Sequence, residues 1–256
     1  MADPIHQFEI TKLVTLGHIG GHEIALTNSA LFMAITVVGI AALLIGASSP
    51  RALIPGRLQS VAEISYEFVA NTIQSTAGTE GMKFFPLVFS LFMFILVANV
   101  IGLVPYAFTV TSHIIITASL ALLVFLTVLA YGFWKNGLHF FKLFVPSGIP
   151  IYILPLIVFI EVLSFLSRPI SHSVRLFANM LAGHMVLFFL LGLIFMLHPA
   201  LAVISVPMAT AIYFLEIFVG LVQAYIFTLL SALFIGMGVA MGHHAHEAHA
   251  EEGGHH

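Results

Sequence analysis

Five apolar segments constrain this chain most strongly, because each is long enough to cross a lipid bilayer. The hydrocarbon core of a bilayer is about 30 Å thick, and roughly 20 apolar residues in a helix span it. The segments lie at 29–47, 84–104, 114–134, 151–190 and 200–241. We therefore predict an all-α polytopic membrane protein with about five transmembrane helices, forming a single membrane domain over 1–256.

The overall composition supports this fold class and excludes several functions. Of the 256 residues, 60% are hydrophobic and 7% are charged, and the mean hydropathy of +1.10 lies far outside the range of soluble domains. The net charge of −3 arises largely at the two ends, and no basic patch indicates nucleic acid as a partner. The absence of cysteine excludes disulfides, cysteine-zinc sites and thiol catalysis.

The segment lengths predict two further features. The last two apolar segments, which together cover 151–241, are each about twice the length that a span needs, so they must tilt strongly, bend or extend beyond the membrane. Residues 58–78 predict an interfacial helix lying in the membrane plane. Its apolar positions recur at helical spacing, with polar residues between them: Val61, Ile64, Phe68, Val69 and Ile73 alternate with Glu63, Glu67 and Asn71.

Basic residues orient the chain. They cluster in the two loops that follow the first and third spans, and these loops should be cytoplasmic by the positive-inside rule: Arg51, Arg57, Lys83, Lys135 and Lys142. The loops "VPYAFTVTSH" and "MLHPA" carry no lysine or arginine. This places the N-terminus on the outer side of the membrane and the C-terminus in the cytoplasm.

The two ends of the chain are polar. Residues 1–28 lack a basic region before an apolar core, so they indicate a periplasmic lead-in to the first span and not a signal peptide. Residues 243–256 contain six histidines and three glutamates. Such tracts can bind metal, but we interpret this one as a solvated cytoplasmic tail and assign it no metal site.

The fourth apolar segment carries a polar stripe. At about 100° per residue, its polar side chains share with Arg175 one face about 100° wide: Glu161, Ser164, Arg168, Ser171, His172 and Asn179. Leu166, Val174, Phe177 and Met185 lie on the opposite face, toward lipid or other helices. His184 falls about 180° from Arg175 in a straight helix, although Gly183 would permit a local bend.

The fifth segment has a matching stripe, since Tyr213, Glu216, Gly220 and Gln223 follow at intervals of three or four residues. We expect the chemistry to lie between these two helices. Carboxylate and imidazole groups in apolar helices are typical of a proton path. A guanidinium does not lose its proton, so Arg175 cannot relay protons but can attract a carboxylate and block their passage.

A structural interpretation stands beside each functional one. A charged residue at a helix centre costs about 2.5–3.5 kcal/mol on insertion scales, so the structural alternative for Arg175 is an ion pair with Glu161 or Glu216. Arg168 can extend its charged end to the membrane surface. Glu161 and His172 fit an interhelical hydrogen bond as well as a proton path, and Asn99 is interpreted as a packing or helix-end residue.

The segment "EVLSFLSRPISHSVRLFANMLAGH", followed by "YFLEIFVGLVQAYIF", resembles the signature of the a subunits of F-type ATP synthases. The similarity extends to "SSPRALIPGRLQSVAEISYEFV" and to the order of spans. The resemblance implies a stationary proton-translocating subunit beside a rotating ring of c subunits, with b-type peripheral stalk subunits and a soluble catalytic head as further partners. It implies no catalysis by this chain alone, no cofactor, and a bacterial inner membrane whose outer side faces the periplasm.

The resemblance also implies residue roles. Arg175 matches the family's essential arginine, which faces the ring carboxylate, and Asn179 and Gln223 match polar residues nearby. His184 and Glu216 match the pair on the aqueous inlet half-channel, exchanged relative to many bacterial members as in mitochondrial relatives. Glu161, Arg168, His172 and Tyr213 form a candidate secondary polar path. The two long helices should form a strongly tilted hairpin along the ring.

Two other functions are weighed against this one. A self-contained proton-coupled transporter predicts broken helices or inverted repeats, and the sequence shows neither clearly. An intramembrane hydrolase needs a serine or aspartate nucleophile paired with a base. Asp3 is the only aspartate, and no Gly-x-Ser-x-Gly motif occurs.

Overall fold

The structure is a computed structural model that describes residues 9–19, 22–48, 56–104, 107–137, 145, 152–196 and 202–252. Side chains are not described at 16–19, 22–24, 136, 191, 193–196, 202 and 238–252. The helices are α1 (Asn28–Ser48), α2 (Arg57–Gly81), α3 (Phe85–Gly102), α4 (Ile114–Asn136), α5 (Leu154–Met196) and α6 (Ala202–Glu252). Two 3₁₀ helices, η2 (Met82–Phe84) and η3 (Val110–Ser112), precede α3 and α4.

The prediction of an all-α polytopic membrane protein is confirmed. Within the described ranges, five helical segments are long and apolar enough to cross a membrane: 28–48, 57–102, 114–135, 154–190 and 203–237. Many large apolar side chains on them are exposed, as a lipid environment allows, with Val38 of α1 at 66% and Phe159 of α5 at 64%. The predicted interfacial helix of 58–78 corresponds to α2.

A β-hairpin precedes the first span, and the sequence analysis did not predict it. Strands β1 (Lys12–Ile19) and β2 (His22–Thr27) pair antiparallel within the expected polar lead-in. Gly20 and Gly21, which separate them in the sequence, are a typical two-residue hairpin signal. The hairpin leads directly into α1, where the Thr27 hydroxyl oxygen accepts a hydrogen bond from the Ala30 amide (3.2 Å) and caps the first turn.

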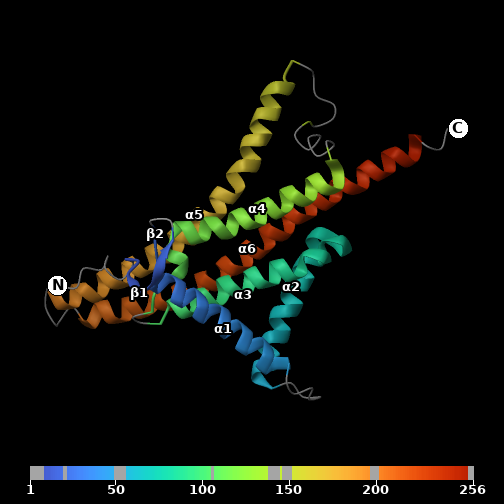
Figure 1. Ribbon diagram of the computed structural model, residues 1–256. Coiled ribbons are helices and arrows are strands. Elements are labelled where there is room, and N and C mark those ends of the chain that lie inside the picture. The colour runs from blue at the N-terminus through green and yellow to red at the C-terminus, as the bar shows by residue number, and fades with distance from the viewer. Residues whose placement is uncertain are drawn as a thin grey trace.

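The junction between α2 and α3 is a sharp kink. Gly78 has φ 67° and ψ −167°, a backbone conformation that favours glycine because it has no Cβ. The chain then passes through η2 into α3, and Figure 1 shows α2 and α3 running in different directions. A continuous helical run from 57 to 102 is thereby divided into two helices.

Helix α6 lies at the centre of the bundle, in contact with α2, α3, α4 and α5 (Figure 1). The core combines apolar side chains from these five helices, including Ile73, Ile95, Val124, Leu176 and Phe227. Small residues allow the closest approaches, since a Cβ at Gly236 of α6 would lie 2.9 Å from the Thr76 carbonyl oxygen of α2.

Both long helices contain an internal proline, Pro169 in α5 and Pro207 in α6. In Figure 1, α5 changes direction partway along its length, and its second half runs beside α6. A proline inside a helix removes one backbone hydrogen bond and bends the axis, so Pro169 accounts for this bend. The excess length predicted for 151–190 is thus accommodated at least in part by bending.

The C-terminal end of α6 continues to Glu252 and includes most of the predicted tail at 243–256. Alanine and glutamate there favour a helix. The hairpin, the end of α3, the start of α4, the end of α5 and the start of α6 all lie toward the left of Figure 1, away from the C-terminal end of α6. The left-hand end corresponds to the predicted periplasmic side.

Candidate functional site

The structure brings His184 of α5 and Glu216 of α6 into direct contact. The imidazole Nδ1 and the carboxylate Oε1 form an ion pair when the ring is protonated. Both side chains are buried, at 6% and 5% exposure. A carboxylate and an imidazole buried together in a membrane bundle are costly unless each satisfies the other, so this pair forms a polar centre inside the chain.

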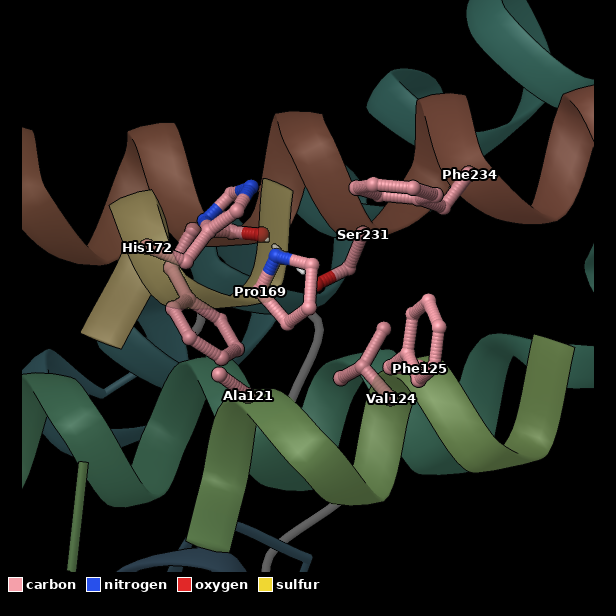
Figure 2. Close-up of a pocket in the computed structure, with 8 residues that line it drawn as sticks. Ala121, Val124, Phe125, Pro169, His172, Ser231 and Phe234 are labelled. Carbon is pink, nitrogen blue, oxygen red and sulfur yellow. Dashed lines mark hydrogen bonds between the residues drawn. The ribbon is translucent and has the colours of Figure 1, made fainter. Parts of the chain in front are cut away.

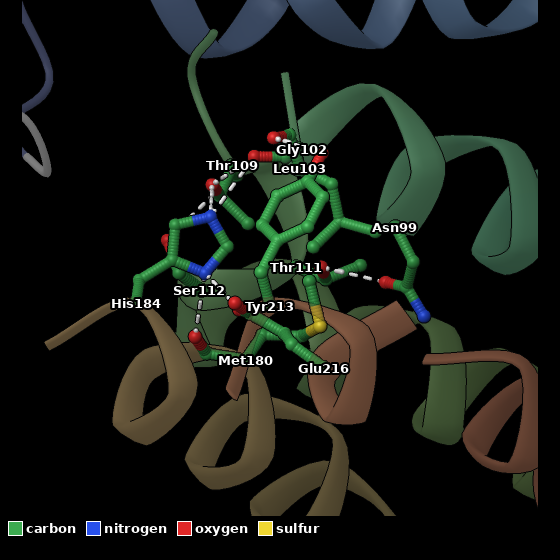
Figure 3. A network of polar contacts seen from close by, with 10 residues as sticks. All are labelled: Asn99, Gly102, Leu103, Thr109, Thr111, Ser112, Met180, His184, Tyr213 and Glu216. Atoms are coloured by element: carbon green, nitrogen blue, oxygen red, sulfur yellow. Dashed lines mark hydrogen bonds and ion pairs between the residues drawn. The ribbon is translucent and has the colours of Figure 1, made fainter. Parts of the chain in front are cut away.

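The His184 ring has further partners on both sides (Figure 3). On the Nδ1 side lies the Met180 carbonyl oxygen at 3.0 Å, one turn earlier in α5. On the Nε2 side lie the Gly102 carbonyl oxygen at 2.9 Å and the Thr109 hydroxyl at 3.1 Å. A carbonyl oxygen can only accept a hydrogen bond, so both ring nitrogens face groups that accept a proton-bearing nitrogen.

Gly183 makes room for the Glu216 carboxylate. A Cβ at this position would lie 2.8 Å from Oε1 and 2.9 Å from Cδ of Glu216. Any larger residue would displace the carboxylate, because real Cβ atoms do not approach other atoms so closely. The sequence analysis considered Gly183 only as a site of bending, and this packing role was missed.

A pocket of about 300 Å³ opens beside the ion pair. Tyr213, on the stripe predicted for 213–223, also lines it, and its hydroxyl donates to the Leu103 carbonyl oxygen (3.2 Å). The remaining lining residues come from three places: Gly102 at the end of α3 with Leu103 and Val104 directly after it, Leu187 and Phe188 of α5, and Val206, Ala209 and Thr210 near the start of α6. The pocket therefore extends from His184 and Glu216 toward the end of α3 and the start of α6.

Asn99 anchors α3 to α6 next to this centre. It is 1% exposed, and its Nδ2 donates to the Gly220 carbonyl oxygen at 3.2 Å, while the Thr111 hydroxyl donates to its Oδ1 at 2.9 Å. The interpretation of Asn99 as a packing residue agrees with these contacts. One turn further along α6, Gln223 is 3% exposed, and its buried Nε2 has no hydrogen-bond partner in the described part of the chain.

Arg175 lies on a different face of α5. Beyond Pro169, the buried residues of this helix include Leu176, Met180 and His184, whereas Arg175 is exposed. No hydrogen bond or ion pair joins its guanidinium to any residue whose side chain the structure describes. The alternative of an ion pair with Glu161 or Glu216 is therefore not observed, and Glu216 is engaged by His184 instead.

The candidate secondary polar path does not form one cluster. Tyr213 lines the pocket beside Glu216, whereas His172 lies in a small apolar pocket between α4, α5 and α6 (Figure 2). The His172 ring packs edge-on against Phe227, with centroids 5.6 Å apart. Arg168 lies over the Phe234 ring at 5.2 Å and close to Met237, and Glu161 is half-buried on α5.

Two other predicted features can be placed. Asn179, one turn beyond Arg175, is half-buried. Among the side chains that the structure describes, no group of three or more His, Asp or Glu could hold a metal ion. The histidines of 243–256 lie outside those side chains.

Sequence reasoning missed the contribution of the loop that joins α3 and α4. Thr109, Thr111 and Ser112 are 3%, 0% and 4% exposed, and two of them contact the polar residues of the site. The available signal was the run of hydroxyl residues in "FTVTSH", a loop predicted to be periplasmic and therefore treated only as an orientation marker.

Comparison with known proteins gives consistent matches over almost the whole chain. The family model for the ATP synthase A chain matches residues 30–236. A Rhodopseudomonas palustris (strain BisB5) protein named ATP synthase subunit a is 60% identical over 248 residues, covering 94% of this chain and 99% of that protein. Proteins of the same name from Afipia carboxidovorans and Nitrobacter winogradskyi are 58% and 57% identical over 249 residues, each covering 95% of this chain and 100% of the relative.

Proposed function

Since this chain belongs to the ATP synthase A chain family, it is the proton-translocating subunit of the membrane sector of a bacterial ATP synthase, and we propose that it moves protons through two offset half-channels separated by Arg175. It is a multi-pass inner-membrane protein, is not catalytic alone, and works with other subunits of the complex. The proposal rests on one observation. The His184–Glu216 pair is buried within the chain, whereas Arg175 is exposed on another face of the same helix.

The inlet half-channel leads from the periplasm to the ion pair. A proton enters the pocket beside Tyr213 and reaches His184 and Glu216, whose buried groups can exchange it because imidazole titrates near neutrality. Gln223 and Asn179 line the continuation toward the ring carboxylate. The unpaired Nε2 of Gln223 supports this placement, since a buried amide donor needs an acceptor such as water or a carboxyl group.

Arg175 separates the two half-channels. An exposed guanidinium on a membrane-spanning helix is costly without a counter-charge, so its partner is a carboxylate on a neighbouring subunit. Beside this fixed cation a carboxyl group loses its proton, and a carboxyl group that moves away can regain one. The arginine thus prevents a proton from passing directly between the half-channels.

The outlet half-channel lies on the cytoplasmic side of Arg175, along the first half of α5. Glu161, Arg168 and His172 contribute polar groups there, although their contacts also fit structural roles. A ring carboxyl group takes up a proton at the inlet, turns almost fully through the lipid, and releases it at this outlet. Because one charge crossing 100 mV provides about 2.3 kcal/mol, several protons must be combined for each ATP.

The partners and orientation follow from the same proposal. The neighbouring subunit that supplies the carboxylate belongs to a ring of c-type subunits. The b-type stalk subunits and the soluble head complete the complex. Helices α5 and α6 lie along the ring as a tilted hairpin. The N-terminus is periplasmic and the C-terminus cytoplasmic, with α2 at the membrane surface as part of one membrane domain. A self-contained transporter is the alternative function. It gives no reason for Arg175 to face outward unpaired.

The proposal is tested by ATP-driven acidification of vesicles that contain the intact complex. Arg175→Ala should abolish pumping while the complex still assembles, and Arg175→Lys should restore little, because an ammonium can lose its proton when desolvated. Arg57→Ala is the matched control, since that arginine is exposed at the start of α2, outside both proposed half-channels, and the variant should retain most of the pumping. Normal pumping by Arg175→Ala would exclude the separating role.

A further inference from the structure

The loop of residues 107–113 folds back into the bundle next to the ion pair. Its Thr109 side chain is 3% exposed and lies against the Nε2 side of His184, while the Glu216 carboxylate lies on the Nδ1 side (Figure 3). The function proposed above assigns no role to this hydroxyl. Buried hydroxyl groups usually bond to the main chain of their own helix, so a contact with a titratable ring 75 positions away is unusual.

The loop is held in place independently of His184. The Ser112 hydroxyl donates to the Thr109 carbonyl oxygen at 2.6 Å, and the Thr111 hydroxyl donates to Asn99 at 2.9 Å. The methyl group of Thr109 packs on Gly102, where an added Cβ would lie 2.9 Å from it. These contacts fix the Thr109 hydroxyl at 3.1 Å from Nε2.

The two partners on the Nε2 side differ chemically. The Gly102 carbonyl oxygen can only accept, so it satisfies Nε2 when that nitrogen carries a proton. A hydroxyl can also donate, so Thr109 can satisfy Nε2 when the proton has left. In the first state the same hydroxyl has an alternative acceptor, because the Gly102 oxygen lies 3.4 Å away.

We propose that Thr109 is a positioning residue for proton transfer through His184. Its oxygen stays in place while its O–H hydrogen points either to the Gly102 carbonyl oxygen or to the ring, so Nε2 has a hydrogen-bond partner in both protonation states. This inference rests on the inlet role proposed for His184 and Glu216. A proton that arrives at Nε2 and leaves from Nδ1 toward Glu216 requires the ring to pass through both states without rotating away. Without the hydroxyl, the deprotonated Nε2 would face only a carbonyl oxygen.

A crossed pair of substitutions separates the hydroxyl from the packing. Thr109→Val keeps the shape and removes the hydroxyl, whereas Thr109→Ser keeps the hydroxyl and removes the methyl group. In vesicles with the intact complex, we expect Thr109→Val to lower ATP-driven pumping about fivefold, the usual effect of one net hydrogen bond. Thr109→Ser should restore pumping to within about twofold of wild type.

Thr36→Val is the matched control, because it removes a buried hydroxyl that, among the residues the structure describes, bonds only to the Phe32 carbonyl oxygen of its own helix, α1. It should pump faster than Thr109→Val. Three results would each overturn the proposal: normal pumping by Thr109→Val, an equal loss in Thr109→Val and Thr109→Ser, or an equal loss in Thr36→Val and Thr109→Val.

A parallel measurement on Glu216→Gln keeps the two proposals distinguishable. If Glu216→Gln fails to pump while Thr109→Val pumps normally, the inlet role stands and only the role of Thr109 is wrong. If Glu216→Gln pumps like wild type, the inlet role is wrong, and the inference that rests on it is wrong as well. Co-purification of the other subunits in equal yield shows that each variant assembles.

Discussion

The His184–Glu216 pair and Arg175 are polar groups on the same long helical hairpin, but the chain treats them in opposite ways. The two members of the pair are 6% and 5% exposed and contact each other, with main-chain oxygens on both sides of the imidazole. Arg175 is exposed and has no ion pair with a described residue. One site is enclosed within the subunit, and the proposed function places the counter-charge of the other on a second subunit.

This difference indicates how one helix can serve two compartments. About two and a half turns of α5 separate Arg175 from His184 along the axis, so the two residues point to different sides. Groups that exchange protons with each other, as proposed for His184 and Glu216, are enclosed by side chains of the same chain. A group that must meet a moving carboxylate stays on the outer face, since any intrachain partner would compete with it.

Among substitutions in the enclosed His184–Glu216 site, removal of the Glu216 carboxylate should reduce proton flux most. Glu216→Gln keeps the shape but removes the acid, so we expect proton flux to fall about a hundredfold, as for loss of a general acid or base. The His184→Glu, Glu216→His exchange should recover part of it. Flux is measured as ATP-driven acidification of vesicles, and an undiminished rate in Glu216→Gln would contradict the assignment.

Displacing the same carboxylate without removing it should have an intermediate effect. In Gly183→Ala the new Cβ would lie 2.8 Å from Glu216 Oε1, so the carboxylate must move, and we expect about a tenfold loss of flux from misplacement. Gly192→Ala is the control on the same helix, because no atom lies within 4 Å of its added Cβ. Equal rates in the two variants would show that the position of the carboxylate is not critical.

The smallest effect should come from His113, in the loop beside the enclosed site, and should be a change in stability with pH. Burial lowers the pKa of His113, which precedes α4 and stacks on Phe108. The unfolded chain therefore binds more protons there, and the stability that His113 contributes is present above about pH 6.5 and is lost as the pH falls below it.

His113→Phe retains an aromatic ring beside Phe108 and removes the titration. Thermal unfolding of the detergent-solubilised complex at pH 7 and pH 5 measures the difference. The melting temperature of this variant should fall by about 2 °C less than that of wild type between the two pH values. An identical fall in both proteins would exclude this contribution of His113.

The sequence predicted the helices well, because apolar length and helical spacing are local properties. The five spans, the separate helix before the second span and the opposite placement of Arg175 and His184 could all be obtained in this way. The β-hairpin was missed because the polar lead-in was compared only with a signal peptide. The bend at Pro169 was missed because the helical phasing assumed a straight axis.

Contacts between distant segments could not be predicted from spacing. Nothing local indicates that Thr109 lies against His184, or that Gly183 lies against Glu216, since each contact depends on how three helices and a loop pack together. The pairing of His184 with Glu216 was expected only from a family resemblance. The physical reason for that pairing, a pocket bounded by α3, α5 and α6, is visible only in the fold.

Disulfide trapping tests most directly whether the Arg175 face is completed by another subunit. The chain contains no cysteine, so single cysteines can be placed at Ala178, which is exposed on the same side as Arg175, and at Met180, which is 1% exposed. A second cysteine is placed one turn from the ring carboxylate. We predict a cross-link from Ala178→Cys and none from Met180→Cys, and the reverse result would contradict the account.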